Sequence, residues 1–244
     1  MKAMVFADRN SKEMLRDPLT LLFSLGFPVV VLLLLSAIQA NIPVSLFAID
    51  HLTPGIAVFG LSFISLFSAT LIARDRTTSF LTRLFTSPLT AADFILGYTL
   101  PLFPLAVGQT VVCFLVALVL KLPLTLNLFV LLAVLLPADL LFIAVGLLCG
   151  SLFTDKQVGG ICGALLTNLT AWLSGTWFDL ELVGGPLQAA ANVLPFVHAV
   201  DAGRAALAGN WGGIFPHVWI VLAWAVGILA AAVLVFRRKM NSDN

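Results

Sequence analysis

The sequence predicts an all-α integral membrane protein with six transmembrane helices, and three observations lead to this prediction. Of the 244 residues, 60% are hydrophobic and 10% are charged, whereas a soluble domain carries about 25% charged residues. The apolar residues gather in stretches long enough to cross about 30 Å of hydrocarbon as a helix. These stretches do not alternate as barrel strands would, so helices remain, because backbone polar groups cannot stay unpaired in lipid.

Six apolar stretches fill most of a single predicted domain, residues 1–244. Their approximate ranges are 20–40, 53–73, 93–120, 126–153, 157–178 and 214–236. The third and fourth are longer than a perpendicular helix needs, and they contain Pro101, Pro104 and Pro137. We therefore expect tilt, kinks or a broken helix in these two spans.

The basic residues give the predicted spans a direction. Basic residues collect on the cytoplasmic side of membrane proteins. With the N-terminus inside, the loops outside contain only Lys121 and Arg204, and the other basic residues all fall in cytoplasmic segments. The opposite orientation would reverse that ratio, so we expect both ends of the chain in the cytoplasm.

The segment 74–87 between the second and third spans predicts a short amphipathic helix on the cytoplasmic side. Its apolar residues fall on one helical face and its polar residues on another. The apolar face consists of Phe80, Leu81, Leu84 and Phe85. Pro88 disfavours helix at Ser87 and so ends the segment. A helix that rests on the headgroups and a docking element for a cytoplasmic partner both remain open.

Two further segments are neither spans nor ordinary loops. The chain before Pro18 mixes apolar and charged residues and is compatible with a helix along the inner membrane surface. Residues 179–213 are too apolar for an exposed loop, and Gly184-Gly185-Pro186 and Leu194-Pro195 punctuate them. We expect two short re-entrant helices there, dipping into the outer leaflet. Asp201 and Arg204 are spaced to pair on the second of them.

Few polar residues lie inside the predicted spans, and each has two interpretations. Asp139 is the only ionisable residue well within a span, and it is either functional or locally accommodated beside Pro137. Gln109 and Asn168 either bond across helices or line a polar substrate path.

We expect packing or interfacial roles, and no metal site, for the histidines, cysteines and small residues. His51, His198 and His217 are expected as separate interfacial residues near the outer face, so no metal site is predicted. The cysteines stand singly in apolar runs and are expected to pack. Small-residue pairs predict close helix contacts, within one chain or across a dimer. They are Gly146 with Gly150, Gly159 with Gly163, and Ala223, Gly227 and Ala231.

Several activities lack their sequence motifs. The chain has no glycine-rich loop ending in Gly-Lys-Ser or Gly-Lys-Thr, no Gly-x-Ser-x-Gly and no His-Glu-x-x-His. No nucleophile with a base is evident for an intramembrane enzyme. The 13 basic and 12 acidic residues nearly cancel, so no basic field suggests a nucleic acid partner. We expect no cofactor on this chain.

Three ordered stretches carry a resemblance to a known family. The first is Leu15-Arg16-Asp17-Pro18, followed by Phe27-Pro28. The second is Arg74-Asp75-Arg76 with Thr78, Leu81, Leu84, Ser87-Pro88-Leu89, Asp93 and Leu96-Gly97. The third runs from Leu194-Pro195-Phe196 through His198 to Gly209. Their order against six spans resembles the type-2 ABC transporter permeases, the membrane subunits of drug-resistance and polysaccharide exporters, especially the daunorubicin-resistance-like branch.

The resemblance implies a mechanism that composition alone does not. The segment around Arg76 to Phe85 would dock on a separate ABC ATPase subunit, which would hold ATP and Mg²⁺. The implied coupling residues are Asp75, Arg76, Leu81, Leu84, Phe85 and Pro88. Asp75 stands where the family usually has glutamate, and Thr77 replaces the usual glycine before Thr78.

The resemblance also implies an assembly and a location. A second permease, identical or different, would complete the exporter in the inner (plasma) membrane of a bacterium or archaeon. Its substrate would be a hydrophobic or amphipathic drug-like compound. Export of a lipid-linked polysaccharide is one alternative, and an ion-coupled secondary transporter is another, although the latter class often has inverted repeats and several buried charges.

Overall fold

The computed structural model describes residues 2–43, 47–77 and 90–242, which form helices, turns and loops without a strand. The first half contains α1 (Lys2–Leu15), α2 (Pro18–Leu21), η1 (Leu22–Gly26), α3 (Phe27–Gln39), α4 (Ile49–Thr77) and α6 (Ala91–Val119). The second half contains α7 (Asn127–Leu152), α8 (Asp155–Val158), η2 (Gly159–Leu166), α9 (Thr167–Leu173), α10 (Leu180–Val183), α11 (Gly185–Val193), α12 (Pro195–Leu207) and α13 (Trp211–Ser242). The all-helical prediction is confirmed.

Within the described residues, five helices are long and apolar enough to cross a membrane. They are Pro18–Gln39, Ile49–Thr77, Ala91–Val119, Asn127–Leu152 and Trp211–Arg238. The range predicted for another span, 157–178, corresponds to α8, η2 and α9, which run on as one helix from Asp155 to Leu173. At about 1.5 Å per residue this helix measures about 28 Å, close to the hydrocarbon thickness. The topology of six spans remains a prediction.

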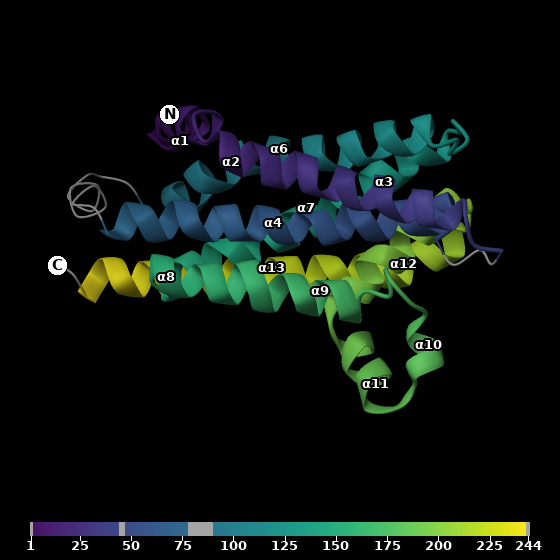
Figure 1. Ribbon diagram of the computed structural model, residues 1–244. Helices are drawn as coiled ribbons and strands as arrows, with labels where there is room; N and C mark the ends of the chain where they lie inside the picture. The colour runs from purple at the N-terminus through teal and green to yellow at the C-terminus, as the bar shows by residue number, and fades with distance from the viewer. Residues whose placement is uncertain (1, 44–46, 78–89, 243–244) are drawn as a thin grey trace.

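The long helices form a bundle with α4 at its centre (Figure 1). The central place of α4 follows from burial: 78% of its most apolar stretch is buried, against 22% in Pro18–Gln39 and 17% in Trp211–Arg238. Small residues bring α7 close to it. A Cβ atom at Gly146 would overlap the Ser65 carbonyl, and one at Gly150 would overlap the Ala69 carbonyl. Gly146 and Gly150 therefore mark a contact within one chain.

The other small residues predicted to mark helix contacts pack less closely within the chain. Among the described residues, a Cβ atom at Gly163 would meet Leu66 alone, at 3.4 Å, and no atom lies within 4 Å of the Cβ positions of Gly159 and Gly227. These two glycines are available to lipid or to another chain.

The two ends of the bundle differ in content. Both chain termini, α1, α8, and the end of α4 lie at one end, which we call the termini end (Figure 1). At the opposite end lie α12 and the start of α4, and α10 and α11 project sideways from the bundle there (Figure 1). The N-terminal segment forms α1, which lies across the termini end rather than along the bundle axis (Figure 1). Its buried face contains Phe6, Ala7, Asn10 and Met14, whereas Met4 is exposed.

Proline positions account for local changes in the helices. The π-helical stretch η1 directly precedes Phe27-Pro28. Pro28 cannot donate a hydrogen bond to the carbonyl four residues earlier, and a shifted bonding register is a common response. Pro101 and Pro104 lie inside α6, and Pro137 lies inside α7. Both helices continue through their prolines, so the broken helix that we considered there is not observed.

The segment before the last long helix forms three short helices, not the two that we expected. Gly184 adopts φ of 60° and separates α10 from α11, a backbone conformation that glycine adopts without a Cβ penalty. Pro195 then starts α12. A turn at Ala208 to Asn210 joins α12 to α13, so residues equally far from this turn lie opposite each other.

Candidate functional site

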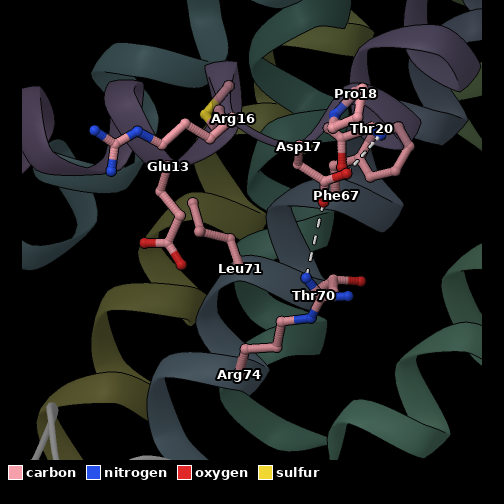
Figure 2. A pocket seen from close by; sticks show the side chains of 10 residues that line it. Glu13, Arg16, Asp17, Pro18, Thr20, Phe67, Thr70, Leu71 and Arg74 are labelled. Atoms are coloured by element: carbon pink, nitrogen blue, oxygen red, sulfur yellow. Dashed lines mark hydrogen bonds and ion pairs between the residues drawn. The ribbon is translucent and has the colours of Figure 1, made fainter.

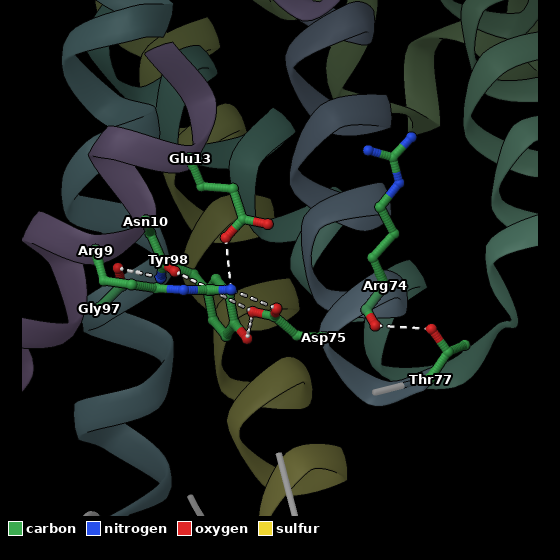
Figure 3. Close-up of polar contacts among 8 residues, drawn as sticks. All are labelled: Arg9, Asn10, Glu13, Arg74, Asp75, Thr77, Gly97 and Tyr98. Atoms are coloured by element: carbon green, nitrogen blue, oxygen red, sulfur yellow. Dashed lines mark hydrogen bonds and ion pairs between the residues drawn. The ribbon is translucent and has the colours of Figure 1, made fainter. Parts of the chain in front are cut away.

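The last turn of α4 joins three helices at the termini end. Asp75 is only 3% exposed, although it stands between two arginines in the sequence. Arg9 of α1 donates two hydrogen bonds to its carboxylate, at 2.8 Å to Oδ2 and 3.0 Å to Oδ1. The Tyr98 hydroxyl of α6 donates a third, at 2.8 Å to Oδ2 (Figure 3). We call these three residues the α4 junction.

Residues of α1 extend the α4 junction. Arg9 also contacts Glu13 Oε2 at 2.6 Å and donates to Asn10 Oδ1 at 2.7 Å. The buried Asn10 in turn donates to the Gly97 carbonyl of α6 at 3.1 Å (Figure 3). Burial alone would lower the pKa of the Arg9 guanidinium, but the hydrogen bond and charge of Asp75 outweigh it and raise that pKa. The pair is therefore held as an ion pair.

Apolar packing fixes α1 in the same place. The Phe6 ring lies 4.9 Å from the Tyr98 ring and 5.6 Å from the Phe94 ring, centroid to centroid, both edge to face. It occupies the space above Gly97, where a Cβ atom would overlap the ring. Small size at residue 97 thus allows α1 to lie against α6.

Arg76 caps the C-terminal end of α7. Its Nη1 group donates to the carbonyl oxygens of Gly150, Ser151 and Phe153, at 2.9, 2.8 and 3.2 Å. These carbonyls belong to the end of α7, where backbone acceptors lack partners within the helix and a cation is favourable. Asp75 and Arg76 therefore tie the end of α4 to α1, α6 and α7.

The predicted coupling residues fall into two groups. Asp75 and Arg76 lie in the last turn of α4, and their contacts described above are made within the chain. Leu81, Leu84, Phe85 and Pro88 lie outside the described residues. After this gap the chain re-forms at α6, which begins with Thr90 and Asp93 capping each other. A role of all six residues in coupling stays a prediction.

The three predicted path residues lie on three different helices, and their role in a substrate path stays a prediction. Gln109 is buried on α6 and its Nε2 lies 3.4 Å from the Ala57 carbonyl of α4. Asp139 is fully buried on α7 near Thr110, and neither of its carboxylate oxygens has a hydrogen-bond partner in the described part of the chain. Asn168 is exposed and donates to the Ala164 carbonyl of its own helix at 2.8 Å. Both interpretations of Asp139 remain open.

A second polar cluster, centred on Arg204, lies at the opposite end. Arg204 Nη2 donates to the Gly175 carbonyl at 2.8 Å and contacts His51 Nδ1 at 3.1 Å, and Nε donates to the His51 carbonyl at 3.3 Å. The predicted pair with Asp201 is confirmed, at 3.6 Å. Arg204 is less exposed than a surface pair would be, with 16% of its side chain accessible. Burial lowers its pKa despite the charge of Asp201.

Two histidines that we expected to stand apart are in contact. His198 Nδ1 of α12 lies 2.8 Å from His217 Nδ1 of α13, and His198 Nε2 lies 2.9 Å from the Asn192 carbonyl. That carbonyl can only accept, so Nε2 carries the proton and His217 donates to His198. The signal in the sequence was the turn at Gly209, because it makes α12 and α13 antiparallel, with His198 11 positions before the turn and His217 8 positions after it.

The comparison with known families decides the identity of the chain. Residues 2–208 match the family model described as ABC-2 type transporter. The chain belongs to this family. It is a multi-pass membrane permease subunit of an ABC-2 transporter, and the family's membrane domain has no ATPase, nucleotide or cofactor site. ABC-2 permeases generally pair with an ABC ATPase. No protein in a search of curated sequences matches this chain.

Proposed function

We propose that this ABC-2 permease exports hydrophobic or amphipathic drug-like compounds, driven by a separate ATPase subunit that docks at the termini end. The observation that carries the proposal is the α4 junction. The segment 78–89 directly follows α4, so a force applied there would reach Asp75 and Arg76 first. Through their hydrogen bonds it would reach α1, α6 and α7 together.

The charges at the termini end support a cytoplasmic location for it. Basic side chains of α1, the end of α4, α8 and the end of α13 belong to this end of the bundle. They are Arg9, Lys12, Arg16, Arg74, Arg76, Lys156, Arg237 and Arg238. Arg204 and Lys121 belong to the opposite end. This asymmetry is that expected for a termini end in the cytoplasm.

A dimeric exporter is part of the proposal. The peripheral helices α3 and α13 leave large apolar side chains exposed, among them Val30, Leu34, Trp219 and Val226. In a membrane such faces meet lipid or another helix. We propose that two permeases, identical or different, form the translocation path between them and that ATPase closure moves the two halves.

Reconstitution tests the function. The permease and the ATPase encoded next to it, if there is one, would be placed together in proteoliposomes loaded with a fluorescent amphipathic drug. We expect drug efflux that requires ATP and both proteins. Movement driven by a proton or sodium gradient without ATP would overturn the proposal in favour of a secondary transporter. Transport of a lipid-linked glycan but not of drugs would overturn the assigned substrate class.

One substitution tests the docking segment. Leu84→Glu places a charge on the predicted apolar face, so we expect ATP hydrolysis to lose its coupling to export while both proteins remain folded. Lys12→Gln on α1 is a control, because Lys12 is exposed and pairs only with Asp8 in the described residues, at 2.6 Å. Wild-type coupling in the Leu84→Glu protein would contradict docking through this face.

A further inference from the structure

A cavity lined by four charged side chains and several apolar ones lies beside the α4 junction, at the bend between α1 and α2 (Figure 2). Its volume is about 210 Å³. It is lined by Glu13, Met14, Arg16, Asp17, Pro18, Thr20, Phe67, Thr70, Leu71 and Arg74. It opens where the helix that lies across the termini end meets the first long apolar helix, which is the level of the lipid headgroups if the termini end is cytoplasmic.

The two guanidinium groups of this cavity, those of Arg16 and Arg74, have few or long polar contacts within the described part of the chain. Arg74 reaches Asp17 at 3.8 Å and Asp155 at 4.0 Å, which are long ion pairs. In the described residues, the Arg16 guanidinium has neither a hydrogen bond nor an ion pair, and it extends toward the side of the cavity where Glu13 lies (Figure 2). A guanidinium offers five N–H donors and matches the geometry of phosphate. The cavity therefore offers donors for a phosphate group.

The same cavity contains two carboxylates. Asp17 Oδ1 accepts from the Thr20 backbone N–H at 3.1 Å, which caps α2 and lowers the pKa of Asp17. Glu13 is engaged by Arg9 through Oε2. About two fifths of the Glu13 side chain and a third of the Asp17 side chain remain accessible, at 43% and 35%. Two anions beside two cations favour a ligand that itself carries both charges.

Exposed apolar side chains follow the cavity residues Pro18 and Thr20 along the first long helix. Leu19, Leu22 and Phe23 are 64%, 63% and 46% exposed, and Phe67 lies in the cavity wall. A cavity with charged side chains, next to a helix with exposed apolar side chains, fits an amphiphile, with its headgroup in the cavity and its acyl chains along the helix.

We infer that this cavity is a binding site for a phospholipid whose headgroup contains both a phosphate and a primary amine, as in phosphatidylethanolamine. Arg74 binds the phosphate, with Thr70 one helical turn before it on the same face. Arg16 adds a second cation at the rim. Glu13 and Asp17 accept hydrogen bonds from the ammonium group. A purely anionic headgroup has no cationic group to pair with the two carboxylates, so it should bind less tightly.

Native mass spectrometry of the full chain in detergent tests this site, with three lipids added separately. We expect phosphatidylethanolamine to bind more tightly than phosphatidylcholine, which has no N–H donor, and more tightly than phosphatidylglycerol, which has no amine. Arg74→Gln should weaken phosphatidylethanolamine binding by about tenfold, since it removes a charge-assisted contact. Lys12→Gln, outside the cavity, should bind all three lipids as the wild type does.

A second pair of variants tests the amine. Asp17→Asn keeps a residue that caps helices well but removes the charge, so the preference for phosphatidylethanolamine over phosphatidylcholine should narrow. Arg16→Gln has no described partner to lose and should weaken binding without changing the fold. Equal binding of the three lipids, tighter binding of phosphatidylglycerol, or unchanged binding by Arg74→Gln would each overturn the inference. No ATP or ATPase is present, so the result is separate from the proposed transport.

Discussion

Each end of the bundle has an arginine that connects its own helix to other segments, and Arg9 and Arg204 bind different kinds of partner. Arg9 at the termini end forms two hydrogen bonds to the carboxylate of Asp75, which outweighs burial and raises the arginine pKa. Arg204 at the opposite end binds two backbone carbonyls and His51 with Asp201 more distant, and burial lowers its pKa. The first is a charge pair between helices, and the second is a bridge between loop and helix backbones.

This difference predicts different responses to substitution. Removing one member of a charge pair leaves the other charge without its partner, which costs more than losing neutral hydrogen bonds. The termini end should therefore depend on single charges, and the opposite end should tolerate their loss better. A cytoplasmic partner that pulls on α4 would act on the more charge-dependent end.

The largest effect is expected from Asp75→Ala. This change leaves Arg9 without its main partner and Tyr98 without its acceptor. Because Arg9 is about one third exposed, with 36% of its side chain accessible, water offsets part of the loss, and we expect about 2 to 4 kcal/mol of destabilisation. Thermal unfolding in detergent measures it. Asp8→Ala removes an exposed pair with Lys12, the one ion pair of Asp8 among the described residues, and should change stability by less than about 0.5 kcal/mol. Similar unfolding temperatures for Asp75→Ala and Asp8→Ala would contradict a special dependence of the termini end on the Asp75 charge.

A smaller effect is expected at Gly97, where α1 meets α6. The new methyl group of Gly97→Ala would overlap the Phe6 ring, so α1 must shift, at a cost of about 1 to 3 kcal/mol. Gly108→Ala is a matched control on the same helix, because no atom of the described residues lies within 4 Å of its Cβ position. Alanine favours helix over glycine by up to about 1 kcal/mol, so this control should be neutral or stabilising. Protease protection of α1 distinguishes a displaced helix from general unfolding.

The effect at Arg204 is expected to be smaller than that at Asp75. Arg204→Ala leaves two carbonyl oxygens and the His51 ring without their donor but strands no fully buried charge, since Asp201 is about one third exposed, at 37%. We expect a loss of about 1 to 2 kcal/mol. Arg204→Lys should recover only part of it, because an ammonium group does not reproduce the fork of the guanidinium. A loss larger than that of Asp75→Ala would contradict the comparison of the two ends.

Much of the architecture was predictable because it depends on local patterns. Long apolar stretches predicted the long helices, and three-residue spacing predicted the Asp201 and Arg204 pair. The α4 junction depends instead on residues far apart in sequence. Arg9 and Asp75 are separated by 66 positions, and Asp75 lies between two arginines, which is the local pattern of an exposed segment. The contact follows only from how α1 lies across α4 and α6.

The same distinction explains what was missed at the opposite end. His198 and His217 belong to two helices, and their spacing has no meaning until the turn at Gly209 makes the helices antiparallel. For Gly146 and Gly150, the spacing alone predicted a close helix contact. The packing against α4 then showed that the contacting helix belongs to the same chain. Short-range spacing therefore predicted contacts on one helix well, and contacts between helices required the packing.

The histidine pair gives the smallest expected effect. His198 Nδ1 and His217 Nδ1 lie 2.8 Å apart and join α12 to α13, and His198 Nε2 lies 2.9 Å from the Asn192 carbonyl. His198→Gln removes the ring that bridges these two groups, so we expect a loss of about 1 kcal/mol or less. Thermal unfolding in detergent measures it, with Lys12→Gln as the control. A loss larger than that of Arg204→Ala would contradict the order of effects, because the pair would then stabilise this end more than Arg204 does.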